Sequence, residues 1–165
     1  NDHTSQFTAV IFFLIFRGTL LMDLPRKSTL FKNSQRDADA RGEILSIVDE
    51  SVQNVSIISC NPGALRSNHY HHTDFHFMYV LEGEIDYFFK DLNSDEVHYL
   101  KVRAGDNIFT PDNEIHATYF PVKTRLIVSS KFPRDQETYE KDTVRVPFVT
   151  SDNIQEMLEK YATNT

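Results

Sequence analysis

Short apolar stretches separated by polar turns run through the middle of the chain, from about residue 42 to residue 132. Segments such as EILSIVD (43–49) and NVSIISC (54–60) are rich in β-branched residues, and FHFMYVLEGEIDYFFK (75–90) reads as two strands around a tight turn. Further breaks occur at 61–63, 93–95, 105–106, 111–113 and 121–122. Many short strands at regular intervals predict an antiparallel all-β sandwich or barrel over residues 40–132.

The pattern changes after residue 132. Residues 133–150 are polar and mixed in charge, which predicts a solvated extension, although TVRVPF (143–148) could add a strand to a partner's sheet edge. Residues 151–162 predict a short amphipathic helix with Ser151 and Asp152 as N-cap candidates. Its apolar face consists of Ile154, Met157, Leu158 and Tyr161. Residues 133–165 therefore form an extension plus a helix, and edge pairing suggests a homodimer.

The N-terminal segment differs from the rest. FTAVIFFLIF (7–16) is apolar throughout, but Arg17 interrupts the apolar run before it reaches the roughly 20 residues that a spanning helix needs. A secretory signal requires positive charge before its apolar part, but no Lys or Arg precedes this one. The segment that starts at Met22 reads like a natural start of the protein. We interpret residues 1–22 as an apolar leader or a non-native extension. We expect membrane contact only if residues 7–22 are a genuine anchor.

Charge and cysteine content narrow the partners and the compartment. The net charge is −7, and no concentrated face of lysine and arginine is present, so we expect no nucleic-acid partner. The single cysteine, Cys60, excludes an intrachain disulfide framework and fits a reducing compartment. We therefore expect a cytoplasmic protein with a small-molecule substrate.

Four of the seven histidines lie in NHYHHTDFH, residues 68–76. His69 and His71 are two apart, which in a strand puts both imidazoles on one face, whereas His72 points the other way. His76 opens the next predicted strand and can return to the same interior position. His116 lies at the start of a later strand.

Two spaced motifs carry a resemblance to a known family. The first runs from Gly63 through ALRSN, His69-Tyr70-His71, HTDF, His76 and FMYVLE to Gly83. The second runs from Gly105 through DNIFT, Pro111-Asp112-Asn113, EI, His116 and ATY to Phe120. Together they resemble the cupin superfamily, with His76 in place of the usual glutamate, Asn113 in place of glycine, and Phe120 in place of asparagine. The resemblance implies a cupin-type jelly-roll barrel.

The resemblance also implies that His69, His71 and His116 are metal ligands, with a fourth ligand from position 76. Neutral imidazoles suit a divalent transition metal such as Fe, Zn, Ni, Mn or Cu better than Mg or Ca. An all-histidine set would leave the ion's charge uncompensated and make it a stronger Lewis acid. The acids nearest in sequence, which could orient the rings, are Asp74, Glu82, Asp86 and Glu114.

Position 76 permits a second, metal-free hypothesis. Some sugar-nucleotide isomerases and epimerases of this superfamily use a histidine as base and a tyrosine as acid at a carbon next to a carbonyl. His69, His71 or His76 could be the base here, and Tyr79, Tyr87 or Tyr119 the acid. For this role we single out His76 and Tyr87. Alternation alone does not tell whether Ile85, Tyr87 and Phe89 or their neighbours line the barrel.

Three functions are therefore open. The first is a metal-dependent isomerase, lyase or dioxygenase that acts on a carbohydrate-like or carbonyl-containing metabolite. The second is a metal-free nucleotide-sugar isomerase or epimerase. It agrees with a looser resemblance of RSNHYHHTDFHFMYVLEGEIDYF (66–88) to small cupins of surface-polysaccharide and nucleotide-sugar pathways, and Arg66, Lys101 or Arg103 could meet a diphosphate. The third is a non-enzymatic ligand-binding or sensor cupin.

Overall fold

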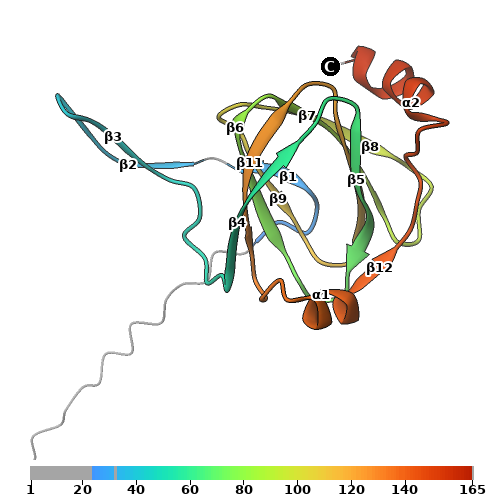
Figure 1. Cartoon of the computed structure of the whole chain (residues 1–165), viewed down its shortest axis with the longest axis horizontal. Coiled ribbons are helices and arrows are strands. Elements are labelled where there is room, and N and C mark those ends of the chain that lie inside the picture. Colours follow the sequence, from blue (N-terminus) through green and yellow to red (C-terminus); the bar gives the residue numbers. More distant parts are fainter. Residues whose placement is uncertain (1–23, 32, 165) are drawn as a thin grey trace, which may run out of the picture.

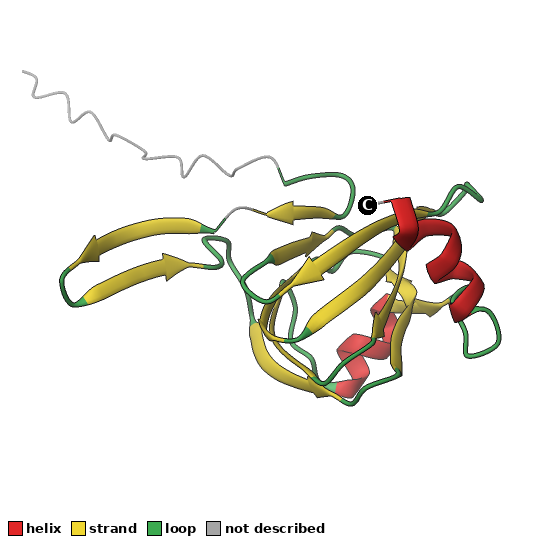
Figure 2. Cartoon of the chain, turned by 90° about the horizontal axis from the view of Figure 1, so that it is seen from above, coloured by secondary structure: helices red, strands yellow, loops and turns green. Residues whose placement is uncertain are grey.

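The computed structural model describes residues 24–31 and 33–164, which fold into a jelly-roll barrel of two facing five-stranded sheets (Figures 1 and 2). The first sheet has the order β1 (Thr29–Phe31), β9 (Asn107–Thr110), β6 (His76–Glu82), β11 (Thr124–Ser130) and β4 (Asn54–Cys60). The second has the order β12 (Thr143–Arg145), β5 (Ala64–His71), β10 (Glu114–Phe120), β7 (Glu84–Asp91) and β8 (His98–Arg103). The predicted all-β jelly roll with a short C-terminal helix is confirmed.

Three further parts lie outside the two sheets. A hairpin of β2 (Ser34–Asp39) and β3 (Gly42–Ser46) projects away from the barrel (Figure 1). Helix α1 (Gln136–Asp142) lies across one end of the barrel, whereas α2 (Ile154–Tyr161), followed by the 3-10 turn η1 (Ala162–Asn164), lies toward the other end.

Strand β7 is buried on both faces, which its sequence alternation alone could not reveal. Ile85, Tyr87 and Phe89 face the core between the two sheets. Phe88 points outward, where it packs with Val149 beneath α2. The residues of α2 that cover it are Ile154, Met157, Leu158 and Tyr161. The predicted apolar face of the helix is therefore confirmed, and its burial explains why β7 is apolar at successive positions.

The start of α2 differs from the prediction. Ser151 and Asp152 lie in the preceding turn, and the N-cap residue is Asn153, whose side chain makes no capping hydrogen bond. Asn153 Oδ1 instead accepts a hydrogen bond from Thr150 N–H. The predicted N-caps are wrong because Ser151 and Asp152 belong to the turn that follows Val149, which packs against Phe88, so the helix begins only after them.

The barrel differs from the predicted bounds of 40–132, because β3 lies within them but outside the barrel, whereas β1 and β12 lie beyond them and belong to it. β1 pairs with β9, and β12 pairs with the chain's own β5, so both complete sheet edges that the pattern did not assign to the barrel. Within 133–150, α1 begins at Gln136 after the N-cap residue Asp135, whose side chain accepts from Thr138 N–H. Elements of three to seven residues are too short to show a hydrophobic period, which is why this segment reads as solvated extension.

The expected leader, residues 1–22, lies outside the described residues. Within the part that is described, no helix is long and apolar enough to cross a membrane.

Candidate active site

Three of the predicted histidines converge inside the barrel. His69 and His71 come from β5, and His116 comes from β10, whose register places it opposite His69. One ring nitrogen of each lies within 4.8 Å of the other two, and the His69 ring centroid is 4.7 Å from those of both partners. All three are buried, whereas His72 is exposed. The strand alternation therefore predicted correctly which side chains turn inward.

Hydrogen bonding leaves a bare nitrogen on His116. Its Nδ1 lies 3.2 Å from the backbone carbonyl oxygen of Glu114, which can only accept, so Nδ1 carries the hydrogen. The buried Nε2 then holds a lone pair, and it has no hydrogen-bond partner among the described residues. His71 Nε2 is likewise buried without such a partner. A buried nitrogen without a hydrogen-bond partner raises the free energy of the folded protein unless a ligand binds it.

Burial holds these imidazoles in the neutral form. Desolvation lowers the pKa of His69 to about 2, of His71 to about 4 and of His116 to about 3. The positive charge of Arg134 lowers all three pKa values further, whereas the Asp142 carboxylate opposes the fall for His71 and the hydrogen bond to the Glu114 carbonyl opposes it for His116. Three neutral, converging imidazoles are the donor set that transition metals prefer, so the residues present fit a divalent transition metal.

His76 stands beside this trio, on the opposite sheet. Its ring centroid is 5.3 Å from that of His116 and 5.7 Å from that of His71, and its nitrogens do not join the mutually close group. Its buried Nδ1 has no hydrogen-bond partner in the described chain. Desolvation holds the pKa of His76 well below its usual value. Three of the four histidines that were expected as ligands are therefore mutually close, and the fourth lies beside them.

A pocket of about 410 Å³ opens onto His69 and His76. Its described lining includes Arg66, Arg134 and Tyr139, and no carboxylate. The pocket lining therefore carries two arginines, of which Arg134 is paired with Asp74 behind the lining.

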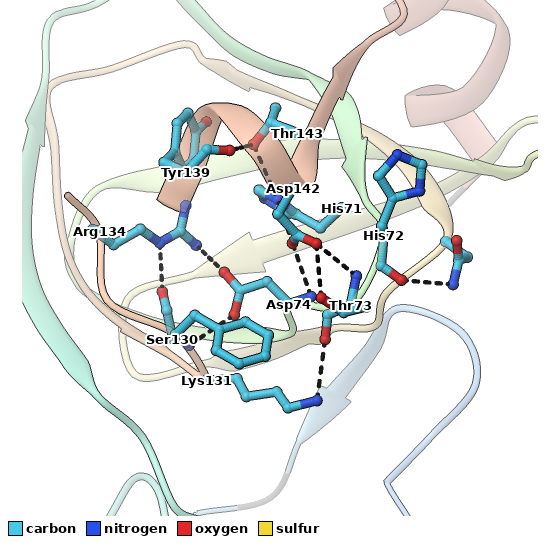
Figure 3. Close-up of polar contacts among 12 residues, drawn as sticks. His71, His72, Thr73, Asp74, Ser130, Lys131, Arg134, Tyr139, Asp142 and Thr143 are labelled. Atoms are coloured by element: carbon cyan, nitrogen blue, oxygen red, sulfur yellow. Dashed lines mark hydrogen bonds and ion pairs between the residues drawn. The ribbon is translucent and has the colours of Figure 1, made fainter. Parts of the chain in front are cut away.

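Arg134 is held in place at this pocket. Its Nε donates to Ser130 Oγ at 2.9 Å, its Nη2 lies 3.2 Å from Asp74 Oδ2, and its guanidinium carbon is 5.1 Å from the ring centroid of Tyr139 (Figure 3). Tyr139 lies in α1, and Arg134 lies in the loop just before it. This segment thus brings a guanidinium and a phenol to the histidines, and sequence reasoning missed both because the segment reads as a solvated extension.

Tyr87, the predicted acid, does not line the pocket. Its ring stacks parallel to that of His116 at 6.1 Å, but its hydroxyl bonds to Ser28 Oγ and Thr110 Oγ1, each at 2.8 Å, and the residue is fully buried. Burial also raises the pKa of this phenol. The pocket's tyrosine is Tyr139, whose ring centroid lies 5.7 Å from that of His71.

The acids nearest the histidines in sequence are mostly engaged elsewhere. The Glu114 carboxylate accepts from Ser28, and Asp86 pairs with Lys101, which removes that lysine from the candidate anion binders. The carboxylate nearest His71 Nδ1 is instead that of Asp142, at 3.6 Å, from the end of α1. Fold and site together define a jelly-roll barrel whose interior histidines open into a pocket lined by two arginines.

The comparisons with known proteins agree with this description. Residues 37–117 match the family model of the polysaccharide biosynthesis C-terminal domain. No curated protein sequence matches the chain.

Solved structures with this fold include three proteins of sugar metabolism. The sugar 3,4-ketoisomerase QdtA from Thermoanaerobacterium thermosaccharolyticum, in complex with TDP, has a TM-score of 0.60 at 16% identity, covering 83% of this chain and 98% of QdtA. The dTDP-4-dehydrorhamnose 3,5-epimerase from Elizabethkingia anophelis has a TM-score of 0.61 at 17% identity, covering 77% and 79%. The capsular polysaccharide assembling protein CapF from Staphylococcus aureus has a TM-score of 0.53 at 22% identity, covering 72% of this chain and 33% of CapF. At these identities the likeness shows the shared fold.

Proposed function

We propose that this protein is an isomerase or epimerase that acts on a nucleotide-linked sugar at a carbon next to a carbonyl group. The observation that carries the proposal is a buried histidine cluster that opens into a pocket lined by two arginines, in the fold shared with QdtA and the 3,5-epimerase. This favours the nucleotide-sugar substrate and the isomerase or epimerase reaction of the second function over a lyase, a dioxygenase or a sensor, and the metal of the first function is proposed separately below.

The two arginines of the pocket suit the phosphate part of such a substrate. Arg66 and Arg134 are planar donors that match phosphate oxygens, and Arg134 keeps a fixed orientation through Ser130 and Asp74. The pocket volume of about 410 Å³ lies in the range of about 300–1,000 Å³ typical of small-molecule sites.

His76 and Tyr139 are the proposed acid–base pair. The neutral imidazole of His76 accepts the proton from the carbon next to the carbonyl. Return of that proton to the former carbonyl carbon, together with transfer of the hydroxyl proton of the deprotonated carbon to the former carbonyl oxygen, moves the carbonyl group by one carbon and isomerises the sugar. Delivery of a proton from the Tyr139 hydroxyl to the opposite face of the original carbon epimerises it. Tyr139 replaces Tyr87 in this role because it lines the pocket.

We further propose that His69, His71 and His116 hold a divalent transition metal. The support is their mutual distance and the bare Nε2 atoms of His71 and His116. When bound, such a metal polarises the substrate carbonyl and acidifies the neighbouring carbon–hydrogen bond. Fe, Zn, Ni, Mn and Cu are all compatible with three imidazoles.

A homodimer completes the proposal. The β2–β3 hairpin projects from the barrel and exposes Ile44 (53%) and Leu45 (38%). β4 is an edge strand whose outer face exposes Val55 (63%) and Ile57 (62%). Isolated two-stranded hairpins are marginally stable, so we propose that each hairpin packs on β4 of a second copy.

Deuterium exchange and metal analysis on the same preparations test the catalytic proposal. The untagged protein is incubated in D2O with TDP- and UDP-linked 4-keto sugars, and deuterium at the carbons beside the carbonyl is followed by mass spectrometry. We expect His76→Gln to slow exchange by roughly 10²–10⁴-fold, as the loss of a general base does, and Tyr139→Phe, which keeps His76, to slow formation of the epimer by a similar factor. The matched control is Tyr70→Phe, because Tyr70 is a half-buried tyrosine of β5 that is not part of the pocket lining.

Metal content separates the two parts of the proposal. About one transition-metal ion per chain, lost in His69→Ala/His71→Ala and kept in His76→Gln, supports the three-histidine site. Exchange by protein that neither contains nor takes up metal would sink the metal site and leave the acid–base pair. No exchange with any of these sugars by folded, metal-loaded protein would contradict the proposed function.

A further inference from the structure

The end of helix α1 meets the back of the His71 ring. Thr143 begins β12, whose register places it opposite His71, and its Oγ1 lies 3.2 Å from His71 Nδ1. The Asp142 carboxylate lies 3.6 Å from the same nitrogen (Figure 3). The other ring nitrogen, Nε2, is buried without a hydrogen-bond partner in the described chain, and His71 is one of the three mutually close imidazoles.

The direction of these hydrogen bonds fixes the tautomer of His71. A threonine hydroxyl has one hydrogen, and that of Thr143 is donated to the backbone carbonyl oxygen of Tyr139 at 2.6 Å. Toward His71 the hydroxyl can therefore only accept. The Asp142 carboxylate can also only accept, so His71 Nδ1 carries the ring hydrogen and Nε2 is left with its lone pair.

A second possible cation site, formed by His71, Asp74 and Asp142, does not agree with the contacts of its carboxylates. Ligand atoms of His71, Asp74 and Asp142 lie close enough together to hold a cation. However, the Asp142 carboxylate already accepts from Thr73 N–H and Oγ1–H and from Asp74 N–H, at 2.8 to 3.0 Å. Asp74 accepts from Phe132 N–H at 3.2 Å and pairs with Arg134. The oxygens are occupied, and a guanidinium already supplies the positive charge.

We propose that Thr143 and Asp142 are positioning residues that hold His71 as the Nδ1–H tautomer, so that Nε2 always presents a lone pair to the metal. The inference rests on the proposed function, because the tautomer matters for binding only if the three histidines hold a metal. Carboxylate and carbonyl partners commonly orient metal-binding histidines in this way. Asp142 also binds the end of α1 to residues 73–74, so the helix that carries Tyr139 and the ring of His71 are placed together.

Long-range ¹H–¹⁵N NMR of the metal-free full chain at neutral pH tests the tautomer directly. We expect His71, assigned through its loss in His71→Gln, to show a protonated Nδ1 and an unprotonated Nε2. Thr143→Val removes the acceptor at equal volume and should shift the ring toward the Nε2–H tautomer. Thr143→Ser keeps the hydroxyl and should restore the wild-type pattern. Thr138→Val is the control, because Thr138 lies on α1 and makes no hydrogen bond to His71; it should leave the tautomer of His71 unchanged.

Zinc affinity, measured by competition with a chelator, supplies the second measurement. We expect Thr143→Val and Asp142→Asn to weaken it by roughly 10–100-fold, as is typical when a partner of a metal-bound histidine is removed. An unchanged tautomer and affinity in folded Thr143→Val would overturn the inference. A wild-type chain with the Nδ1–H tautomer that binds no zinc would overturn the metal site alone and leave the role of Thr143 in setting the tautomer intact.

Discussion

Glu114 shows how one buried side chain can tie a terminal segment to the barrel. Its carboxylate is 2% exposed and accepts from Ser28 N–H, at 3.1 and 3.0 Å to its two oxygens. Ser28 in turn bonds to Tyr87, whose ring stacks on His116. Desolvation raises the pKa of Glu114 to about 7, although the hydrogen bonds from Ser28 oppose this rise.

This raised pKa predicts a pH dependence of stability. The folded protein keeps the Glu114 proton up to about pH 7, whereas a free carboxyl releases it near 4.5. The resulting stabilisation is fully present below pH 4.5 and is lost as the pH rises to 7, by on the order of 3 kcal/mol at 1.36 kcal/mol per pKa unit. Urea unfolding of metal-free protein should show that stability relative to Glu114→Gln falls over this range. The exposed Glu137→Gln control should leave the profile unchanged, and a flat difference curve for Glu114→Gln would contradict the prediction.

At the scale of elements, the two glycines of the first motif are required for different reasons. Gly83 joins β6 to β7 with φ of +86°, and a Cβ there would lie 2.5 Å from the Lys123 carbonyl oxygen and 2.8 Å from Thr124 Cα. Gly63 has a similar φ of +82°, but nothing lies within 4 Å of a Cβ at that position. Gly83 is therefore needed for close backbone approach, whereas Gly63 is needed only for its dihedral angle.

The two alanine variants should separate these causes. Gly63→Ala should cost about 1–2 kcal/mol from the left-handed backbone alone. Gly83→Ala should lose that amount plus roughly 1–3 kcal/mol, because the β11 backbone must shift. Chemical unfolding of both variants measures the difference. Equal losses would show that the approach of Thr124 to the turn does not constrain Gly83.

At the scale of the whole molecule, the projecting hairpin predicts the oligomeric state. We expect sedimentation analysis to find a dimer that Ile44→Ser/Leu45→Ser and Val55→Lys/Ile57→Lys each convert to a folded monomer, since both would remove apolar contact area. Leu92→Ser/Val122→Ser changes two other exposed apolar residues and should stay dimeric. A monomeric wild type, or a dimer that survives both interface variants, would exclude this mode of association.

The strand pattern was readable from the sequence because alternation is a local property of a strand. NVSIISC coincides with β4, and the inward turn of His69 and His71 is confirmed. The number and spacing of strands predicted an all-β sandwich or barrel, and the cupin resemblance implied the jelly roll. The distances between imidazoles were not readable. His76 lies on the opposite sheet from the trio, and the separation of the sheets is set by the side chains packed between them.

The sequence by itself therefore determined the fold class, the interior histidines and the outer helix, because each depends on residues a few positions apart. Only the tertiary structure decided which tyrosine reaches the pocket and which carboxylate stands behind His71. Tyr139 and Asp142 belong to a seven-residue helix that carries no periodic signal, and Thr143 meets His71 across 72 residues of chain. Such contacts arise when short elements dock on a formed barrel, and local pattern does not encode that docking.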